Sequence, residues 1–336
     1  MAPHQTRPSG VRCRARFDAT VEFKRELCSE HFLLRLRLAE SFPATKPGQF
    51  VQLGCRAPAD RGAAQLPELQ WKASKVLNPT DRDLCGPLAL LRRPFSLAGR
   101  GEAGDETWID IIGRVVGVGT RWLSELEQGD SVDLIGPLGN WFDRPEDRCL
   151  ALLVGGGVGL PPMFYLAEAL KAAGWEAVAF VGARRRDLLA VTFNEETPPN
   201  REGLPTLCVA EFARFDYPTV ITTDDGSCGL HGQITNSLEL ILKGLSGSMI
   251  PKAIVYTCGP EPMMQGAAKL AERYGVACQV CLEQSMACGM GTCQSCVVRI
   301  DPGRQQPHGL TRDGRSWRYR LACSDGPVFD SKVVVW

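Results

Sequence analysis

The stretch Cys149-Leu-Ala-Leu-Leu-Val-Gly-Gly-Gly-Val-Gly159 decides the fold class of this 336-residue chain. An apolar run closed by glycines, followed by the helix-like segment Pro161–Ala173, is typical of a buried strand, a tight turn and a helix. Glycine amides that lead into a helix N-terminus can approach a dinucleotide pyrophosphate closely. The loop is not G-x-G-x-x-G, so it is not the dehydrogenase fingerprint, and a tight turn without a ligand is the alternative.

The chain downstream of this stretch repeats the pattern of apolar strand, turn and helix. Four further buried strands are expected, at Val178–Val181, Thr206–Val209, Thr219–Thr222 and Ala253–Cys258. Such alternation predicts a doubly wound parallel sheet over residues 148–280. The last strand runs into a second loop, Cys258-Gly259-Pro260. Because ligands bind at the carboxyl ends of parallel strands, we expect both loops at one edge of the sheet.

Upstream, residues 11–147 read as short strands and turns with few helices. The best strand candidates are Arg14–Phe23, His31–Leu38, Phe50–Cys55, Phe95–Ala98, Thr107–Arg114 and Ser131–Ile135. Short strands without intervening helices predict an antiparallel barrel or sandwich. A single helix is expected at Thr120–Glu127. The stretch 56–91 is polar, contains four prolines and has no sustained period, so it is interpreted as an insertion. A loop of that length is usually functional or mobile.

Two segments of this β-rich half could bind phosphate. Arg92-Arg93-Pro94-Phe95-Ser96 places a guanidinium, which suits a bidentate phosphate contact, beside a predicted strand. Gly117-Val-Gly119-Thr120 leads into the expected helix, with Thr120 as the candidate N-cap. By themselves, the first segment could be a surface arginine before a strand and the second a capped turn.

Four cysteines lie near the C-terminus, at Cys288, Cys293, Cys296 and Cys323. C-x4-C-x2-C with a distant fourth cysteine is the plant-type ferredoxin spacing for a 2Fe–2S cluster, which transfers one electron at a time. Gly289 and Gly291 permit the backbone to wrap closely around such a cluster. Zinc sites usually have two short knuckles instead, so a zinc site and disulfides are the less favoured alternatives. Residues 281–336 are therefore expected to form a small cluster domain that ends in the strand Lys332–Trp336.

Composition favours an ordinary globular protein. Hydrophobic residues make up 44%, and Lys+Arg and Asp+Glu are both 38, so no net charge favours nucleic acid or an anionic membrane. Residues 1–10 lack the apolar core of a secretory signal, and glycines and prolines interrupt the most apolar run, Leu150–Tyr165. Fourteen cysteines in a chain without a signal predict reduced thiols and a cytoplasmic location.

These motifs together resemble the ferredoxin–NADP reductase-like flavoproteins. Within that superfamily the chain is similar to the electron-transfer subunits of two-subunit dihydroorotate dehydrogenases. The likeness is carried by Leu282–Cys296, Ala322–Asp330, Thr223–Ser227 and Gly117–Ser124. The resemblance implies that the barrel binds FAD, the α/β domain binds NAD and the cysteines bind the cluster. The implied FAD contacts are Arg93, Pro94, Phe95, Ser96, Gly117, Gly119 and Thr120; the implied nicotinamide contacts are Gly155, Gly156, Gly157, Gly159, Cys258, Gly259 and Pro260.

The resemblance also implies a reaction. Ser96 and Cys258 would lie at the hydride-transfer centre, and Glu283 is a candidate beside the flavin. Electrons would pass from the FMN of a separate catalytic subunit, in a heterotetramer of two plus two, through the cluster and FAD to NAD. Arg184–Arg186 leave NADP open, since arginines could accept a 2′-phosphate. The alternatives are a subunit serving ferredoxin, hydrogenase or a sulfur-reducing partner, and a cluster-based redox sensor.

Overall fold

A sheet built around the glycine-rich strand forms one half of the molecule in the computed structural model, which describes residues 14–38, 42–55, 91–104, 106–301, 303 and 317–336. The strand order is β10-β9-β8-β7-β11-β12-β15, and all neighbours are parallel except β12 and β15. The strands are β7 (Leu150–Gly156), β8 (Glu176–Ala183), β9 (Thr219–Thr223), β10 (Leu230–His231), β11 (Ala253–Cys258), β12 (Ala277–Cys281) and β15 (Val328–Asp330). The predicted doubly wound sheet is confirmed.

Helices cover both faces of this sheet. They are α3 (Leu160–Ala172), α4 (Ala210–Ala213), α5 (Ile234–Gly244) and α6 (Glu261–Arg273). One core packs α3 and α4 against the sheet, and a second packs α5 and α6 on the opposite face. Strand β7 lies between the two cores and is buried along its whole length, which is why its sequence is continuously apolar.

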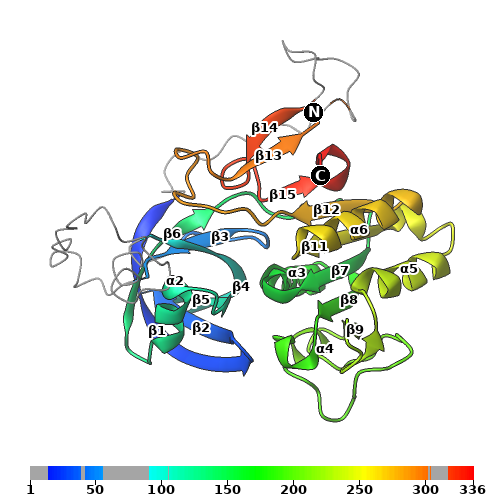
Figure 1. The fold of residues 1–336 in the computed structure, drawn as a ribbon, viewed down its shortest axis with the longest axis horizontal. Coiled ribbons are helices and arrows are strands. Elements are labelled where there is room, and N and C mark those ends of the chain that lie inside the picture. Colours follow the sequence, from blue (N-terminus) through cyan, green and yellow to red (C-terminus); the bar gives the residue numbers. More distant parts are fainter. Residues whose placement is uncertain (1–13, 39–41, 56–90, 105, 302, 304–316) are drawn as a thin grey trace, which may run out of the picture.

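The other half is a closed antiparallel barrel, with the strand order β1-β2-β5-β4-β3-β6 (Figure 1). Its strands are β1 (Ala15–Cys28), β2 (His31–Leu38), β3 (Phe50–Leu53), β4 (Arg93–Ala103), β5 (Glu106–Arg114) and β6 (Ser131–Leu138). The short helix α2 (Val118–Glu125) packs the fully buried Leu123 into the barrel core. The barrel, rather than the sandwich, is therefore the correct alternative. The predicted insertion lies almost entirely outside the described residues.

Helix α3 joins the two halves. It contacts β4, and the Tyr165 hydroxyl on α3 donates a hydrogen bond to the Thr45 carbonyl oxygen at 3.0 Å. The side chain of Tyr165 also packs on the barrel core. Because α3 begins directly after the glycine loop, the barrel is anchored to the same element that carries the predicted nucleotide site.

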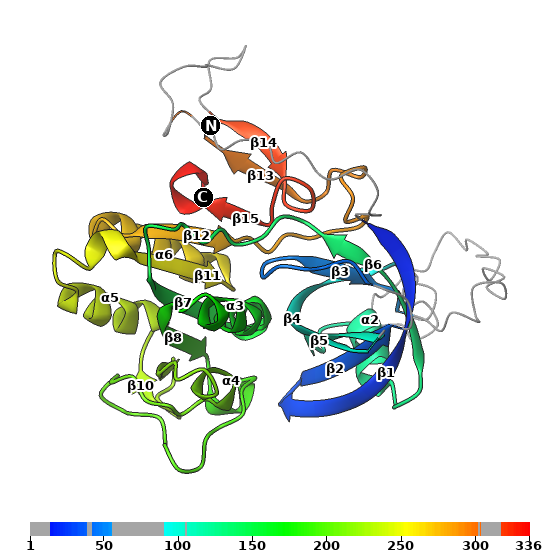
Figure 2. The same ribbon diagram turned by 180° about the vertical axis from the view of Figure 1, so that it is seen from behind.

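The C-terminal residues return to the sheet after a small hairpin. Strand β13 (Val297–Ile300) pairs with β14 (Arg318–Leu321), and β15 then pairs with β12. Both views show the orange loop before β13 passing over the barrel beside β3 and β6 (Figures 1 and 2). None of the helices within the described ranges is long and apolar enough to cross a membrane.

Two predicted strands are wrong. The segment Lys332–Trp336 is not a strand: Ser331–Val333 forms a single 3-10 turn, and Val334 makes only an isolated bridge to Ile300. The segment Thr206–Val209 makes two isolated antiparallel bridges and does not join the parallel sheet. In both segments an apolar pattern predicted a strand. An apolar pattern indicates burial, but it does not reveal whether the backbone pairs with a neighbouring strand.

Candidate functional site

The two glycine loops of the sheet interlock at its carboxyl edge. A β-carbon on Gly159 would overlap the carbonyl of Cys258, and one on Gly259 would lie 2.8 Å from the Gly156 carbonyl oxygen. Gly259 has φ +143°, so it also needs a backbone conformation that other residues rarely adopt. Gly157, with φ +55°, faces open space. The protein therefore forms a closed backbone cradle in front of α3, where an anion would meet the helix N-terminus.

The adjacent arginines at the start of β4 have different environments. Arg92 forms an ion pair with the buried carboxylate of Asp133 and bonds the carbonyl oxygens of Gln52 and Asp133. Arg93 has no carboxylate partner among the described residues and bonds only the carbonyl oxygens of Leu91 and Arg92. Arg92 therefore stabilises the barrel, whereas the charge of Arg93 is available to an anionic ligand.

The second phosphate candidate lies directly against Arg93. A β-carbon on Gly119 would be 3.3 Å from the Cγ and Nε atoms of Arg93, so this glycine permits the approach of the guanidinium stem. The prediction of Thr120 as N-cap is wrong: Gly117 is the N-cap, and Thr120 sits in the first turn. Its hydroxyl accepts bonds from the Val116 and Gly117 amides at 2.9 and 3.2 Å. The structure thus brings Arg93 and the start of α2 together.

The rest of the β4 motif divides between two faces of the strand. Phe95 packs in the barrel core, while Pro94 and Ser96 pair across the strand with Gln52 and Phe50 of β3. Phe50 belongs to the core that also holds Cys296 and Cys323. Ser96 therefore lies on the side of β4 that faces the C-terminal part of the chain.

Cys258 and Glu283 are neighbours. The two residues were expected separately, Cys258 at the hydride-transfer centre and Glu283 beside the flavin. The Cys258 thiol donates to the Glu283 carboxylate at 3.9 Å, and Cys258 pairs with Cys281 of the adjacent strand. The neighbouring Cys281 thiol and burial raise the pKa of Cys258 well above its usual value, so the thiol is neutral. Glu283 exposes surface towards a groove of about 430 Å³, but the protein around it raises the pKa of its carboxyl by desolvation.

The four C-terminal cysteines gather into two pairs. The Cys288 sulfur accepts the amides of Met290 at 3.3 Å and Cys293 at 3.4 Å. Hydrogen bonds with the side chain and backbone of Ser295, followed by those with the backbone and side chain of Cys288, lower the pKa of the Cys293 thiol to about 6. In the second pair, burial and the neighbouring Cys296 thiol raise the pKa of Cys323 to about 12.

This arrangement fits a two-iron cluster. Each pair would supply two sulfurs to one iron, and the amides that point at Cys288 would stabilise the anionic cluster. Gly289 and Gly291, at φ +69° and +89°, provide the predicted close wrap of the loop. Two thiolates held this close together would repel one another, and a bound metal centre would supply the compensating positive charge. Within the described ranges no three His, Cys, Asp or Glu side chains are placed to bind one ion together.

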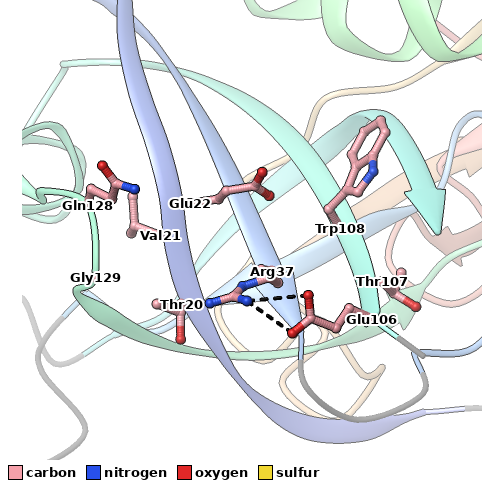
Figure 3. A pocket seen from close by; sticks show the side chains of 9 residues that line it. All are labelled: Thr20, Val21, Glu22, Arg37, Glu106, Thr107, Trp108, Gln128 and Gly129. Carbon is pink, nitrogen blue, oxygen red and sulfur yellow. Dashed lines mark hydrogen bonds and ion pairs between the residues drawn. The ribbon is translucent and has the colours of Figure 1, made fainter. Parts of the chain in front are cut away.

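A larger hollow on the barrel wall is not part of this site (Figure 3). It measures about 480 Å³ and is lined by residues of β1, β2 and β5 and the loop before β6, among them Glu22, Trp108 and Gln128. Arg37 and Glu106 form an ion pair across it at 3.0 Å. None of the predicted site residues lines this hollow.

The sequence did not reveal Gln52. This residue of β3 is fully buried beside Gly289, and a glutamine in an alternating strand carries no signal of such a position. Its contact could be found only once the barrel and the cluster loop were placed together.

The fold and these sites define a flavoprotein reductase of the ferredoxin–NADP reductase type with an added iron–sulfur domain. A solved structure described as an NADH-dependent reduced ferredoxin–NADP oxidoreductase, studied for flavin-based electron bifurcation, is 25% identical, with a TM-score of 0.67, over 95% of this chain and 90% of that one. A ferredoxin reductase of carbazole 1,9a-dioxygenase shares the fold at 20% identity and a TM-score of 0.54, over 78% of this chain and 67% of that chain.

Comparison with known sequences identifies the family. Residues 283–335 match the model of the iron–sulfur cluster binding domain of dihydroorotate dehydrogenase B. The electron transfer subunit of dihydroorotate dehydrogenase B (NAD(+)) from Caldanaerobacter subterraneus subsp. tengcongensis is 32% identical over 252 residues, which cover 75% of this chain and 84% of that protein. The subunit from Geobacillus thermodenitrificans is 37% identical over 249 residues, 73% of this chain and 80% of that protein. The chain belongs to this family of electron transfer subunits.

Proposed function

We propose that this chain carries electrons between a dihydroorotate-oxidising partner subunit and NAD, through a 2Fe–2S cluster and FAD. One observation carries the proposal: the cluster loop touches both halves of the molecule. Gly289 packs against Gln52 of the barrel, and Glu283 lies beside Cys258 at the end of β11. The proposed flavin, nicotinamide and cluster sites therefore meet in one place.

The residues divide among the three groups as follows. Arg93 holds the flavin pyrophosphate together with the Gly117–Thr120 turn, and Ser96 lies near the reactive ring. The interlocked loops at Gly155–Gly159 and Cys258–Pro260 bind the nicotinamide dinucleotide. FAD, when bound, exchanges two electrons with a nicotinamide and single electrons with a cluster. We assign residues 11–147, 148–280 and 281–336 to the FAD, NAD and cluster units.

The partner is proposed from the family. Dihydroorotate would be oxidised on an FMN-containing catalytic subunit, in an assembly of two copies of each chain. The chain itself should not oxidise dihydroorotate. NAD is favoured over NADP, because two of the three arginines after β8 are already engaged: Arg185 forms an ion pair with Asp187 at 2.9 Å, and Arg186 lies over the Phe193 ring.

The test uses the loaded chain with and without the catalytic subunit. We expect flavin and 2Fe–2S absorbance, NADH–dye reductase activity alone, and NAD-dependent orotate formation when the FMN subunit is added. NADP in place of NAD should support much slower turnover. Zinc instead of iron in an anaerobically prepared sample would contradict the proposal.

A ferredoxin-linked role is the second candidate, because the solved bifurcating oxidoreductase matches nearly the whole chain. It predicts NADH-dependent reduction of ferredoxin by the loaded chain and no orotate formation with the FMN subunit. The two activities can be measured on one preparation, so the outcome assigns the partner directly.

A further inference from the structure

Gln52 is a fully buried amide without a hydrogen-bond partner. Its exposed fraction is 0%, and neither Nε2 nor Oε1 has a partner among the described residues. Leaving a buried polar group unpaired costs roughly 1–3 kcal/mol. Two such groups on one side chain indicate that a group outside the described residues completes their hydrogen bonding.

The side chain of Gln52 faces the cluster loop. A β-carbon on Gly289 would lie 2.7 Å from the Cγ atom of Gln52 and 2.8 Å from Nε2. Gly289 directly follows the first cluster cysteine and has φ +69°. Any other residue there would push against the amide, so the glycine serves the contact with Gln52 as well as the turn.

Strand pairing places the same side chain beside the flavin motif. Gln52 is directly opposite Pro94 in the β3–β4 pair, and directly paired residues share one face of a sheet. The neighbouring core residues Val51 and Leu53 point into the barrel instead. Gln52 therefore lies on the outer face of the barrel, between the start of β4 and the loop that carries Cys288.

Among the described residues, the donors to the Cys288 sulfur come from its own loop. The amides of Met290 and Cys293 reach the sulfur from the C-terminal side of Cys288. The barrel contributes no donor to that sulfur among the described residues. Gln52 is the polar side chain of β3 that is close enough to Gly289 to supply one from the barrel side.

We propose that Gln52 is a positioning residue for the iron–sulfur cluster, with Nε2–H donating a hydrogen bond to a sulfur at the Cys288 side of the cluster. The inference rests on the proposed function. Hydrogen bonds to the sulfurs raise a cluster's reduction potential, because they stabilise the more negative reduced state. Through this bond, the barrel that holds the flavin would set how easily the cluster accepts an electron.

The test compares Gln52→Met with the wild-type full chain, both loaded with FAD and cluster. Methionine keeps the length of the side chain and removes the donor. We expect unchanged iron, sulfide and flavin content, and an altered electron paramagnetic resonance spectrum of the reduced cluster. At a fixed solution potential, the ratio of reduced to oxidised cluster should fall about tenfold, equivalent to ~59 mV for one electron. The flavin potential and the NADH–dye rate should not change.

Ser237→Ala is the matched control. Ser237 is also a buried polar side chain without a partner in the described part of the chain, but it lies on α5, far from the orange loop in Figure 1. The cluster spectrum and potential should stay at the wild-type values. If Gln52→Met does not fold, Gln52→Glu keeps the shape and puts an acceptor in place of the donor. That variant should lower the potential further or lose the cluster while retaining FAD.

The outcomes separate the two proposals. Wild-type protein that binds no 2Fe–2S cluster contradicts the proposed function. A loaded wild type whose cluster spectrum and potential are reproduced by the Gln52 variants overturns the inference alone. A shift of the flavin potential with an unchanged cluster also overturns it, because the amide would then serve the flavin.

Discussion

The nucleotide cradle and the cluster loop solve the same problem, binding an anionic group, in opposite ways. In the cradle, Gly159 and Gly259 are packed against the backbone of the facing loop, so its shape is complete in the protein alone. In the cluster loop, Cys293 is exposed, while burial and the neighbouring Cys296 thiol raise the pKa of Cys323 to about 12. The first site is stabilised by steric fit, and the second is completed by its metal.

The adjacent Arg92 and Arg93, at the start of β4, show the same difference. Arg92 is satisfied by Asp133 within the barrel, whereas Arg93 has only carbonyl partners. Substitutions should therefore fall into two classes. Substitutions at contacts that are complete within the protein chain should affect stability or substrate binding. Substitutions at groups that need a bound cofactor should affect cofactor content.

Loss of a cluster ligand should have the largest effect. Cys323→Ser removes one sulfur of the buried pair, so iron and sulfide content should collapse and NAD-dependent orotate formation with the partner subunit should fall about 100-fold or more. NADH–dye activity should stay near wild type, because it needs only flavin. Cys149→Ser, at an exposed free cysteine, is the control and should leave both readouts unchanged. Retention of the full cluster signal in Cys323→Ser would refute the ligand assignment.

The arginine pair gives the next largest effect. Arg93→Ala should weaken FAD binding about 10- to 100-fold, since a hydrogen bond to a charged group contributes roughly 1.5–3 kcal/mol. Its free energy of unfolding without FAD should change little. Arg92→Ala should do the reverse and lower that free energy by about 1–3 kcal/mol, because buried Asp133 loses a partner. Flavin fluorescence titration and urea unfolding measure the two quantities, and equal effects of both variants would contradict the division.

Gly159→Ala tests the preformed cradle. The added methyl group would overlap the Cys258 carbonyl, so the loops must separate, at a cost of about 1–3 kcal/mol in stability. We expect KM for NADH to rise about tenfold while the cluster spectrum is retained. Gly244→Ala, where a β-carbon meets no atom within 4 Å, is the control. Wild-type KM in Gly159→Ala would show that the contact is not required.

The smallest effect should come from Glu283→Gln. Although Glu283 exposes part of its surface, desolvation by the surrounding protein raises the pKa of its carboxyl above the ordinary 4.5, so the folded state favours the protonated form. Its contribution to stability is complete below pH 4.5 and is lost as pH rises through the raised pKa. Glu283→Gln should therefore gain stability relative to wild type above that range. Thermal unfolding of both proteins from pH 4.5 to 8 checks this, and parallel curves would contradict it.

The sequence predicted those features that depend on local pattern. Glycine spacing around Gly155–Gly159 and the cysteine spacing led to the α/β sheet and the cluster domain. Strand β12 and the hairpin of β13 and β14 were not predicted, because their pairing depends on partners distant in the chain. The contacts of Gly119 with Arg93 and of Gln52 with Gly289 were equally hidden, since each joins segments that only the tertiary structure brings together.

Strand β15 gives the cluster unit a second attachment to the sheet. The chain leaves the sheet from β12 and returns through β15, which pairs with β12 in the opposite direction. A protein engineer could not exchange the cluster unit by cutting a single linker, because removing β15 would bare the edge of β12 and invite pairing with other chains. A transplanted cluster unit would have to be joined both after β12 and before β15, with Val328–Asp330 kept as the edge strand that pairs with β12.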